Sequence, residues 1–166
     1  ALALLWECRA GPPSRRFLRA SKQSLVKHWP LTWQSADLRF ALDPAAKAAD
    51  LVLYFGDRAL ISEASCVASL REICPRALIV GCSTGTVVSG SSLADETVSA
   101  VALSFEHTRL RLVSLEIDVA SSFAVGRQLA ETLAADDLVG ILVLSDGLNV
   151  NGSALVSGLQ SVIGHE

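Results

Sequence analysis

Short apolar runs along the chain predict three buried strands. They are the segments LVLYF (51–55), ALIV (77–80) and GILVL (140–144), each bounded by polar or turn-forming residues. A run of this length is typical of a strand that is covered on both faces. Two further segments, 98–106 and 110–118, predict strands joined by a short polar connection. In the second of these, apolar and polar residues alternate, which indicates a sheet with one solvated face.

Helical periodicity predicts the elements between these strands. We expect helices over 62–74, where Pro75 follows, and over 122–134. A last helix begins after the cap residue Asn151, and the dipeptide at 43–44 (Asp-Pro) predicts a further helix start. The order is therefore strand, helix, strand, hairpin, helix, strand, helix. It predicts an α/β or α+β fold in which helices pack on a layered mixed β-sheet.

Charge distinguishes the beginning of the chain from the rest. The first 30 residues carry six lysines and arginines against one acidic residue, whereas the other 136 carry eight basic and sixteen acidic residues. We treat residues 1–42 as a basic N-terminal segment of uncertain structure and 43–166 as the folded domain. Because the domain is acidic, we expect no nucleic-acid partner. No apolar stretch is long enough to span a bilayer, so we expect no membrane insertion.

The four cysteines do not form a metal-binding pattern. No C-x-x-C pair is present among Cys8, Cys66, Cys74 and Cys82, which argues against a zinc site. We expect core thiols of a reducing compartment and hence a cytoplasmic protein.

The segment GCSTGT, which follows the strand at 77–80, contains a G-x-S-x-G pattern. This pattern is typical of the nucleophile elbow of serine hydrolases, and Ser83, Asp146 and His165 follow one another in the hydrolase order. An elbow also needs a helix directly after the turn, and the sequence after Gly85 is rich in valine, serine and threonine, which disfavours a helix. We therefore expect a non-catalytic domain, with an esterase-like hydrolase as the alternative.

Two polar segments at strand ends are the predicted ligand-binding residues. The first is Gly81, Cys82, Ser83, Thr84 and Gly85, and the second contains Ser145, Asp146, Gly147, Asn149 and Asn151. In α/β proteins, ligands collect at the carboxyl ends of strands, so the two segments can line one crevice if their strands run parallel and lie close. A carboxylate that faces hydroxyls, amides and a helix N-terminus suits a small zwitterion such as an amino acid.

These two segments also resemble those of a known family. The chain is similar to the FIST domain (F-box and intracellular signal transduction) over about residues 43–164, on the GCST and SDGLNVNGSALVSGL segments and the strands that precede them. The family usually continues GCST differently from the Gly85-Thr86-Val87 found here. The resemblance implies a sensory domain of bacterial signal transduction that binds a small ligand, with amino acids among the candidates. It also implies an output partner such as a histidine kinase, and a chain that stops before the C-terminal part of the family's domain.

We predict no cofactor, and a haem-based gas sensor is the alternative that the resemblance implies. Haem commonly needs an axial histidine, and the candidates are His28, His107 and His165. No C-x-x-C-H attachment pattern is present. The expected function is therefore ligand sensing without a prosthetic group.

Overall fold

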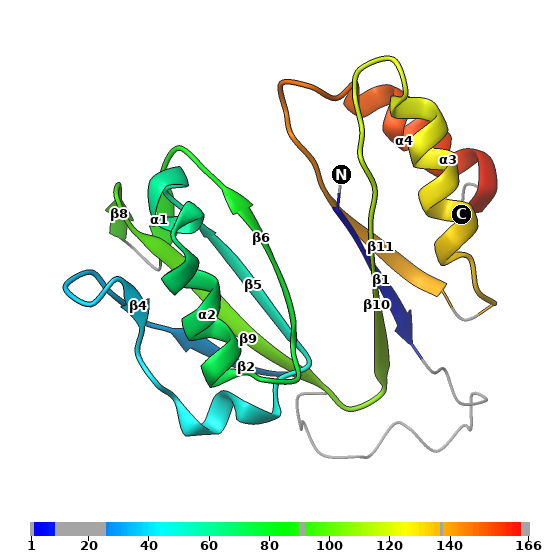
Figure 1. The fold of residues 1–166 in the computed structure, drawn as a ribbon. Coiled ribbons are helices and arrows are strands. Elements are labelled where there is room, and N and C mark those ends of the chain that lie inside the picture. The colour runs from blue at the N-terminus through cyan, green and yellow to red at the C-terminus, as the bar shows by residue number, and fades with distance from the viewer. Residues whose placement is uncertain (1, 9–25, 90–91, 137, 164–166) are drawn as a thin grey trace. The chain divides into compact units, whose positions relative to one another are not determined.

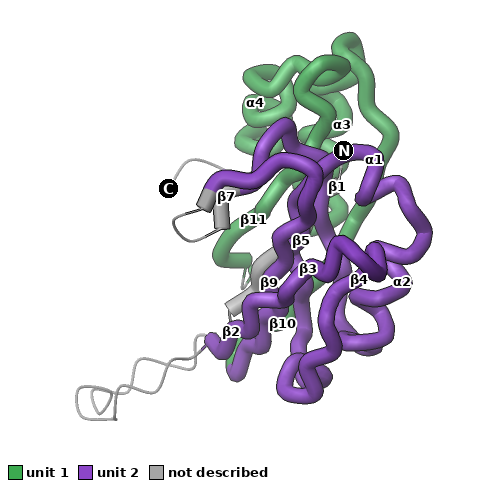
Figure 2. Tube along the Cα trace, turned by 90° about the vertical axis from the view of Figure 1, so that its left-hand side faces the viewer, with its two compact units in different colours: residues 1–20, 107–166 green, residues 21–106 purple. Residues whose placement is uncertain are grey.

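The structure, a computed structural model, consists of two compact units (Figure 1). It describes residues 2–8, 26–89, 92–136 and 138–163. Unit 1 combines residues 1–20 with 107–166, and unit 2 is formed by residues 21–106; Figure 2 shows them in green and purple. The N-terminal strand thus joins the last third of the chain in one unit, while the middle of the chain forms the other.

Unit 2 is built on a four-stranded mixed sheet. Its strand order is β2 (Val26–Leu31), β9 (Val98–Phe105), β5 (Leu51–Gly56) and β6 (Leu78–Ser83). Strands β5 and β6 run parallel, whereas β9 pairs antiparallel with both β5 and β2. The central position of β5 fits its continuous apolar sequence, and Leu51 and Val52, which point to opposite faces of the sheet, are both completely buried.

Helices and small ladders complete unit 2. They are η2 (Pro44–Ala48), α1 (Arg58–Ser62), α2 (Ala64–Ile73), the pair β3 (Trp33–Gln34) and β4 (Arg39–Phe40), and the pair β7 (Val87–Ser89) and β8 (Ser92–Ala94). Asp43 caps the 3₁₀ helix η2, since its side chain accepts a hydrogen bond from the amide of Ala45 at 2.9 Å. The apolar face of α2, which includes Leu70 and Ile73, packs in a core with Val52 of β5 and Ala102 of β9.

Unit 1 is built on a three-stranded antiparallel sheet. Its order is β10 (Thr108–Ser114), β1 (Leu2–Cys8) and β11 (Leu138–Leu144). The helices α3 (Ser122–Leu133) and α4 (Gly152–Ile163) pack against each other and against this sheet (Figure 1). Their core contains Leu129, Leu133, Leu155 and Leu159, with Ile141 of β11 packed against it.

The predicted mixed α/β fold with helices packed on sheets is confirmed, with two corrections to its strands. First, the expected hairpin of 98–106 and 110–118 does not form. Strand β9 already has β2 and β5 as neighbours, so β10 pairs instead with β1 in the other sheet. Second, the expected buried strand at 140–144 lies at the edge of its sheet, and its side chains are only partly buried.

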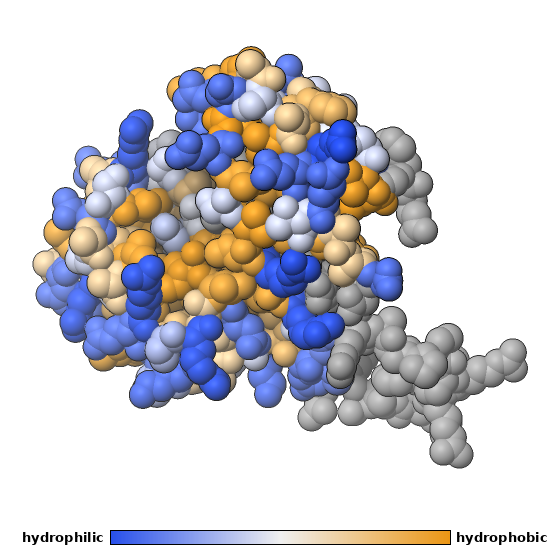
Figure 3. All heavy atoms as spheres, turned by 45° about the vertical axis from the view of Figure 1, so that its right-hand side comes forward, coloured by the Kyte–Doolittle hydropathy of each residue, from blue (hydrophilic) through white to orange (hydrophobic). Residues whose placement is uncertain are grey.

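Apolar side chains also reach the surface. On the face that Figure 3 displays, hydrophobic residues lie between hydrophilic ones. Among the described helices, none is long and apolar enough to cross a membrane.

The domain boundary that the sequence analysis placed between residues 42 and 43 stays a prediction. Strands β2, β3 and β4 lie before it in sequence and belong to unit 2.

Candidate functional site

The first predicted segment, Gly81–Gly85, continues the end of β6 in unit 2. Gly81, Cys82 and Ser83 still pair with β5, where Ser83 lies opposite Gly56. The amide of Thr84 donates to the carbonyl of Gly56 at 2.9 Å, and the Thr84 hydroxyl donates to the carbonyl of Thr86, also at 2.9 Å. The Thr84 side chain therefore shapes the turn, while the Ser83 side chain is exposed to solvent.

Gly81 is required by the packing of the sheet. A Cβ at this position would lie 2.0 Å from the carbonyl oxygen of Tyr54 and 2.6 Å from the Tyr54 ring. A backbone carbonyl in a ladder cannot move away without breaking the pairing of β5 and β6. By contrast, a Cβ at Gly85 would meet nothing within 4 Å, so this glycine lies in open space.

The thiol of Cys82 is partly buried. Burial disfavours the thiolate and raises the pKa of the Cys82 thiol above its ordinary value. A cysteine that acts as a nucleophile needs the opposite shift, toward a lower pKa. Cys82 therefore has the character of a packing residue with a protonated thiol.

The geometry of a nucleophile elbow is not found at Ser83. The segment that follows Gly85 forms strand β7 and not the helix that an elbow requires. Asp146 belongs to unit 1, whereas Ser83 belongs to unit 2, and His165 lies outside the described residues.

The second predicted segment, Ser145–Asn151, follows β11 in unit 1 and is held by its own side chains. The two carboxylate oxygens of Asp146 accept hydrogen bonds from the amide of Leu148 at 2.8 Å and from the side-chain amide of Asn149 at 2.7 Å. This is the turn that aspartate forms with the backbone two residues further on. Asp146 thus fixes the conformation of the loop, and the Leu148 side chain at its tip is 92% exposed.

Ser122 anchors the end of this loop to α3. Its side chain is completely buried, and its hydroxyl accepts a hydrogen bond from the amide of Asn151 at 3.0 Å. The same hydroxyl donates to the carbonyl of Asp118 at 2.7 Å. The side-chain oxygen of Asn151 accepts from the amide of Ala154 at 3.1 Å, which confirms Asn151 as the cap of α4. These bonds bring the beginnings of α3 and α4 together.

Asp118 and Ser121 form a second turn beside Ser122. The Asp118 carboxylate accepts hydrogen bonds from the hydroxyl and the amide of Ser121, at 2.6 and 2.7 Å. These bonds favour the ionised form and lower the pKa of Asp118. The sequence analysis did not select Asp118, Ser121 or Ser122. The available indication was an aspartate followed by two serines just before an apolar helix, a pattern typical of helix starts.

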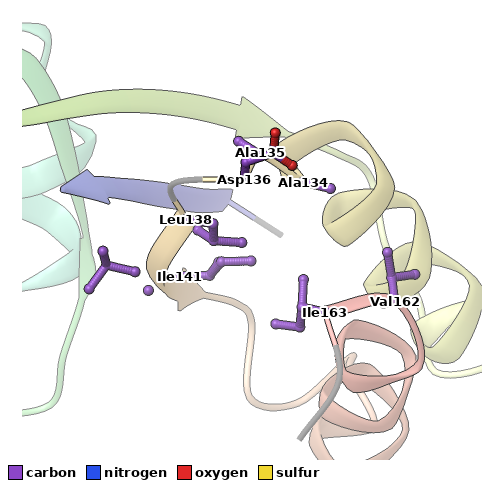
Figure 4. Close-up of a pocket in the computed structure, with 9 residues that line it drawn as sticks. Ala134, Ala135, Asp136, Leu138, Ile141, Val162 and Ile163 are labelled. Carbon is purple, nitrogen blue, oxygen red and sulfur yellow. The ribbon is translucent and has the colours of Figure 1, made fainter. Parts of the chain in front are cut away.

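The predicted residues therefore form two segments, each ordered within its own unit. Strands β6 and β11, which lead into them, belong to different sheets, and the shared crevice stays a prediction. A cavity of about 640 Å³ is present elsewhere in unit 1 (Figure 4). It is lined by Ala134, Ala135, Asp136, Leu138, Val139, Gly140, Ile141, Val162 and Ile163, and none of the predicted residues takes part.

The described histidines lie at exposed positions, His28 on β2 and His107 between β9 and β10. Neither lines the cavity of Figure 4. Within the described ranges, no group of three or more histidine, cysteine, aspartate or glutamate side chains is arranged to hold a metal ion. The haem alternative stays a prediction without a supporting arrangement of residues.

Polar loops at the carboxyl ends of β6 and β11 are at the kind of position where α/β domains bind small ligands. The family model described as the FIST N domain matches residues 50–166, which is more than half of the chain. The chain belongs to the FIST family, as its two motifs predicted, and it is a sensory domain of signal transduction. No curated protein and no solved structure was found to match it.

Proposed function

We propose that this sensory domain binds a small zwitterion, with free amino acids as the first candidates, at the loop Ser145–Asn151. The observation that carries the proposal is the order of an exposed polar loop. Its polar side chains lie at the surface, yet the Asp146 carboxylate accepts hydrogen bonds from the amide of Leu148 and the side chain of Asn149, and the amide of Asn151 donates to the buried Ser122 hydroxyl. A loop that is already in its bound conformation loses less entropy when a ligand binds.

The chemistry of the loop suits both ends of an amino acid. The first amides of α4, at Gly152 and Ser153, lie at a helix N-terminus, where a ligand carboxylate is stabilised. The Asp146 carboxylate, which shapes the loop, supplies the negative charge that attracts a ligand ammonium group. The side-chain oxygen of Asn149 is a second acceptor for that group.

The segment Gly81–Gly85 of unit 2 is a separate candidate for ligand binding. Its exposed Ser83 hydroxyl is the group we assign to ligand binding, because the Thr84 hydroxyl is engaged in the turn. Each segment is tested by its own substitution. For the whole protein we propose a cytoplasmic sensor whose ligand shifts the population of two conformations that an output partner, such as a histidine kinase, distinguishes.

The test is thermal unfolding of the chain with each of the common amino acids at millimolar concentration. A ligand present at about a hundred times its Kd adds about 2.7 kcal/mol to stability. For a chain of this length, that corresponds to a shift in Tm of about 5–10 °C. Absence of a shift with every amino acid would contradict the amino-acid class.

Three variants locate the site. Asn149→Ala removes an acceptor, and Gly147→Val adds bulk where a Cβ meets nothing within 4 Å, so both should reduce the ligand-induced shift. Ser83→Ala tests the second segment. Glu116→Gln, an exposed carboxylate of the same unit, is the control and should retain the full shift. A shift that all three site variants retain would place the ligand elsewhere.

A further inference from the structure

Ser122 in unit 1 and Ser69 in unit 2 are the buried polar residues among those that the structure describes. Each hydroxyl donates a hydrogen bond to a carbonyl three or four residues earlier in the chain. Each also accepts a hydrogen bond from a main-chain amide 29 residues away. Because a buried polar group without a partner is costly, each serine holds two distant segments of its unit together.

The distant segment that Ser122 holds is the end of the proposed ligand loop. Asn151 is the last residue of that loop, and its amide donates to the Ser122 hydroxyl at 3.0 Å. Its side-chain oxygen accepts from the amide of Ala154, and its carbonyl accepts from the amide of Leu155 at 2.9 Å. A change in the loop that moves the Asn151 backbone therefore changes the hydrogen bond to Ser122.

On its other side, the Ser122 hydroxyl depends on the turn at 118–121. It donates to the carbonyl of Asp118 at 2.7 Å. The Asp118 carboxylate in turn accepts from the hydroxyl and the amide of Ser121, and these bonds fix the turn. A hydroxyl has a single proton, so its bond to Asp118 determines where its lone pairs point. An altered turn therefore weakens the acceptor that the amide of Asn151 uses.

The helices that follow these two segments are in direct backbone contact. A Cβ at Gly126 of α3 would lie 2.1 Å from the carbonyl oxygen of Leu155 in α4, and a Cβ at Gly158 would lie 2.1 Å from that of Phe123. No layer of flexible side chains separates the helices at these points. Close-packed elements transmit strain, so a shift at the beginning of one helix affects the other.

We infer that Ser122 is a positioning residue that couples the loop Ser145–Asn151 to the turn at 118–121, so that the two surface segments change conformation together. The role of this coupling in signalling rests on the proposed function, because the loop is the proposed ligand site. Coupling acts equally in both directions. A ligand that orders the loop therefore also orders the beginning of α3, where Val119 and Phe123 are 58% and 47% exposed.

The experiment is amide hydrogen exchange of the 166-residue chain without ligand, followed for single residues by NMR. Asp118→Ala removes an exposed carboxylate from the turn and should accelerate exchange at Asn151 about fivefold or more, the lower end of usual coupling factors. Exchange at Leu148, whose amide is bonded to Asp146, should accelerate in the same variant. In the reverse direction, Asp146→Ala should accelerate exchange at Ser121.

Two matched variants distinguish coupling from a general loss of stability. Glu131→Ala removes another exposed carboxylate of α3, which accepts a hydrogen bond from Arg127 at 2.7 Å. Ser69→Ala removes the comparable buried hydroxyl of unit 2. Neither should change exchange in the loop. The amide of Ala134, which donates to Ala130 at the end of α3, should keep its wild-type rate in Asp118→Ala.

Ser122→Ala tests the connection itself. In this background, Asp118→Ala should no longer change exchange at Leu148; if Ser122→Ala does not fold, the Asp118 and Asp146 variants decide. Unchanged loop exchange in Asp118→Ala would overturn the inference, as would equal acceleration in Glu131→Ala or coupling that persists in Ser122→Ala. Acceleration of all amides of unit 1 alike would also overturn it. These outcomes need no ligand, so they are separate from a failure of every amino acid to raise the Tm.

Discussion

The contact between α3 and α4 depends on two glycines that face the backbone of the opposite helix. A Cβ at Gly126 would lie 2.1 Å from the carbonyl oxygen of Leu155. A Cβ at Gly158 would lie 2.1 Å from the carbonyl oxygen of Phe123 and 2.9 Å from the amide nitrogen of Arg127. Backbone atoms of a helix cannot rotate away as a flexible side chain can. Alanine at either position must therefore push the two helices apart.

The expected effect of Gly158→Ala has two opposing parts. Alanine in the middle of a helix is favoured over glycine by about 1 kcal/mol. Overpacking of a close contact costs about 1–3 kcal/mol or more. Here the added Cβ would lie 2.1 Å from the carbonyl oxygen of Phe123, whereas an ordinary contact is at least 3.4 Å long. Separation of the helices also loosens the packing of the core residues Leu129 and Leu155. We expect the free energy of unfolding to fall by about 2 kcal/mol, which corresponds to about a thirtyfold fall in the folding equilibrium constant.

Urea unfolding followed by circular dichroism measures this loss, and a matched glycine on the same helix provides the control. Gly152 is the first residue of α4, and a Cβ there meets nothing within 4 Å. Gly152→Ala should leave stability unchanged or raise it slightly. If Gly158→Ala and Gly126→Ala are as stable as Gly152→Ala, the close helix contact cannot be what requires glycine.

Three further predictions concern other parts of the fold. Gly81→Ala should destabilise unit 2 by about 2 kcal/mol through its clash with Tyr54, measured as a lower urea midpoint; an unchanged midpoint would exclude the clash. Ser122→Ala should cost about 1–3 kcal/mol, because the amide of Asn151 loses its buried acceptor, and hydrogen exchange at that amide should accelerate. Burial raises the pKa of the Cys66 thiol, so the folded chain holds this proton more tightly than the unfolded chain. The contribution of this proton to the free energy of unfolding should therefore be fully present below about pH 8.5 and be lost as the pH rises above it. A fall of the same slope in Cys66→Ala would assign the effect to other groups.

The elements of the fold were largely predictable, because their patterns are local. The apolar run of β5, the periodic face of α3 and the cap at Asn151 each appear within one segment of sequence. Strand pairing was not predictable in the same way. Nothing within residues 98–118 indicates that β9 takes β2 and β5 as neighbours, which leaves β10 to pair with β1.

The candidate site shows the same division between local and distant information. The loop at Asp146 was predicted from its own residues, and the structure adds that its carboxylate is used to shape the loop. Ser122 was missed because its role depends on Asn151, which lies 29 residues away. Gly81 was selected as a ligand contact, whereas its measurable constraint comes from Tyr54 on the neighbouring strand.

Strand β11 shows how the two kinds of information can be combined. Its sequence alone predicts a strand covered on both sides, since a continuous apolar run without a charge is typical of a sheet interior. Among the strands that the structure describes, it has one neighbour, β1. The mismatch between an apolar sequence and an edge position is recognised only when the sequence and the strand order are considered together. An apolar strand in the interior of a sheet needs no protection, and an edge strand with arginines, such as β10, already has it. Where composition and position disagree in this way, the edge needs another form of protection, and the register shift between β1 and β11 at Val139 is one that the structure shows.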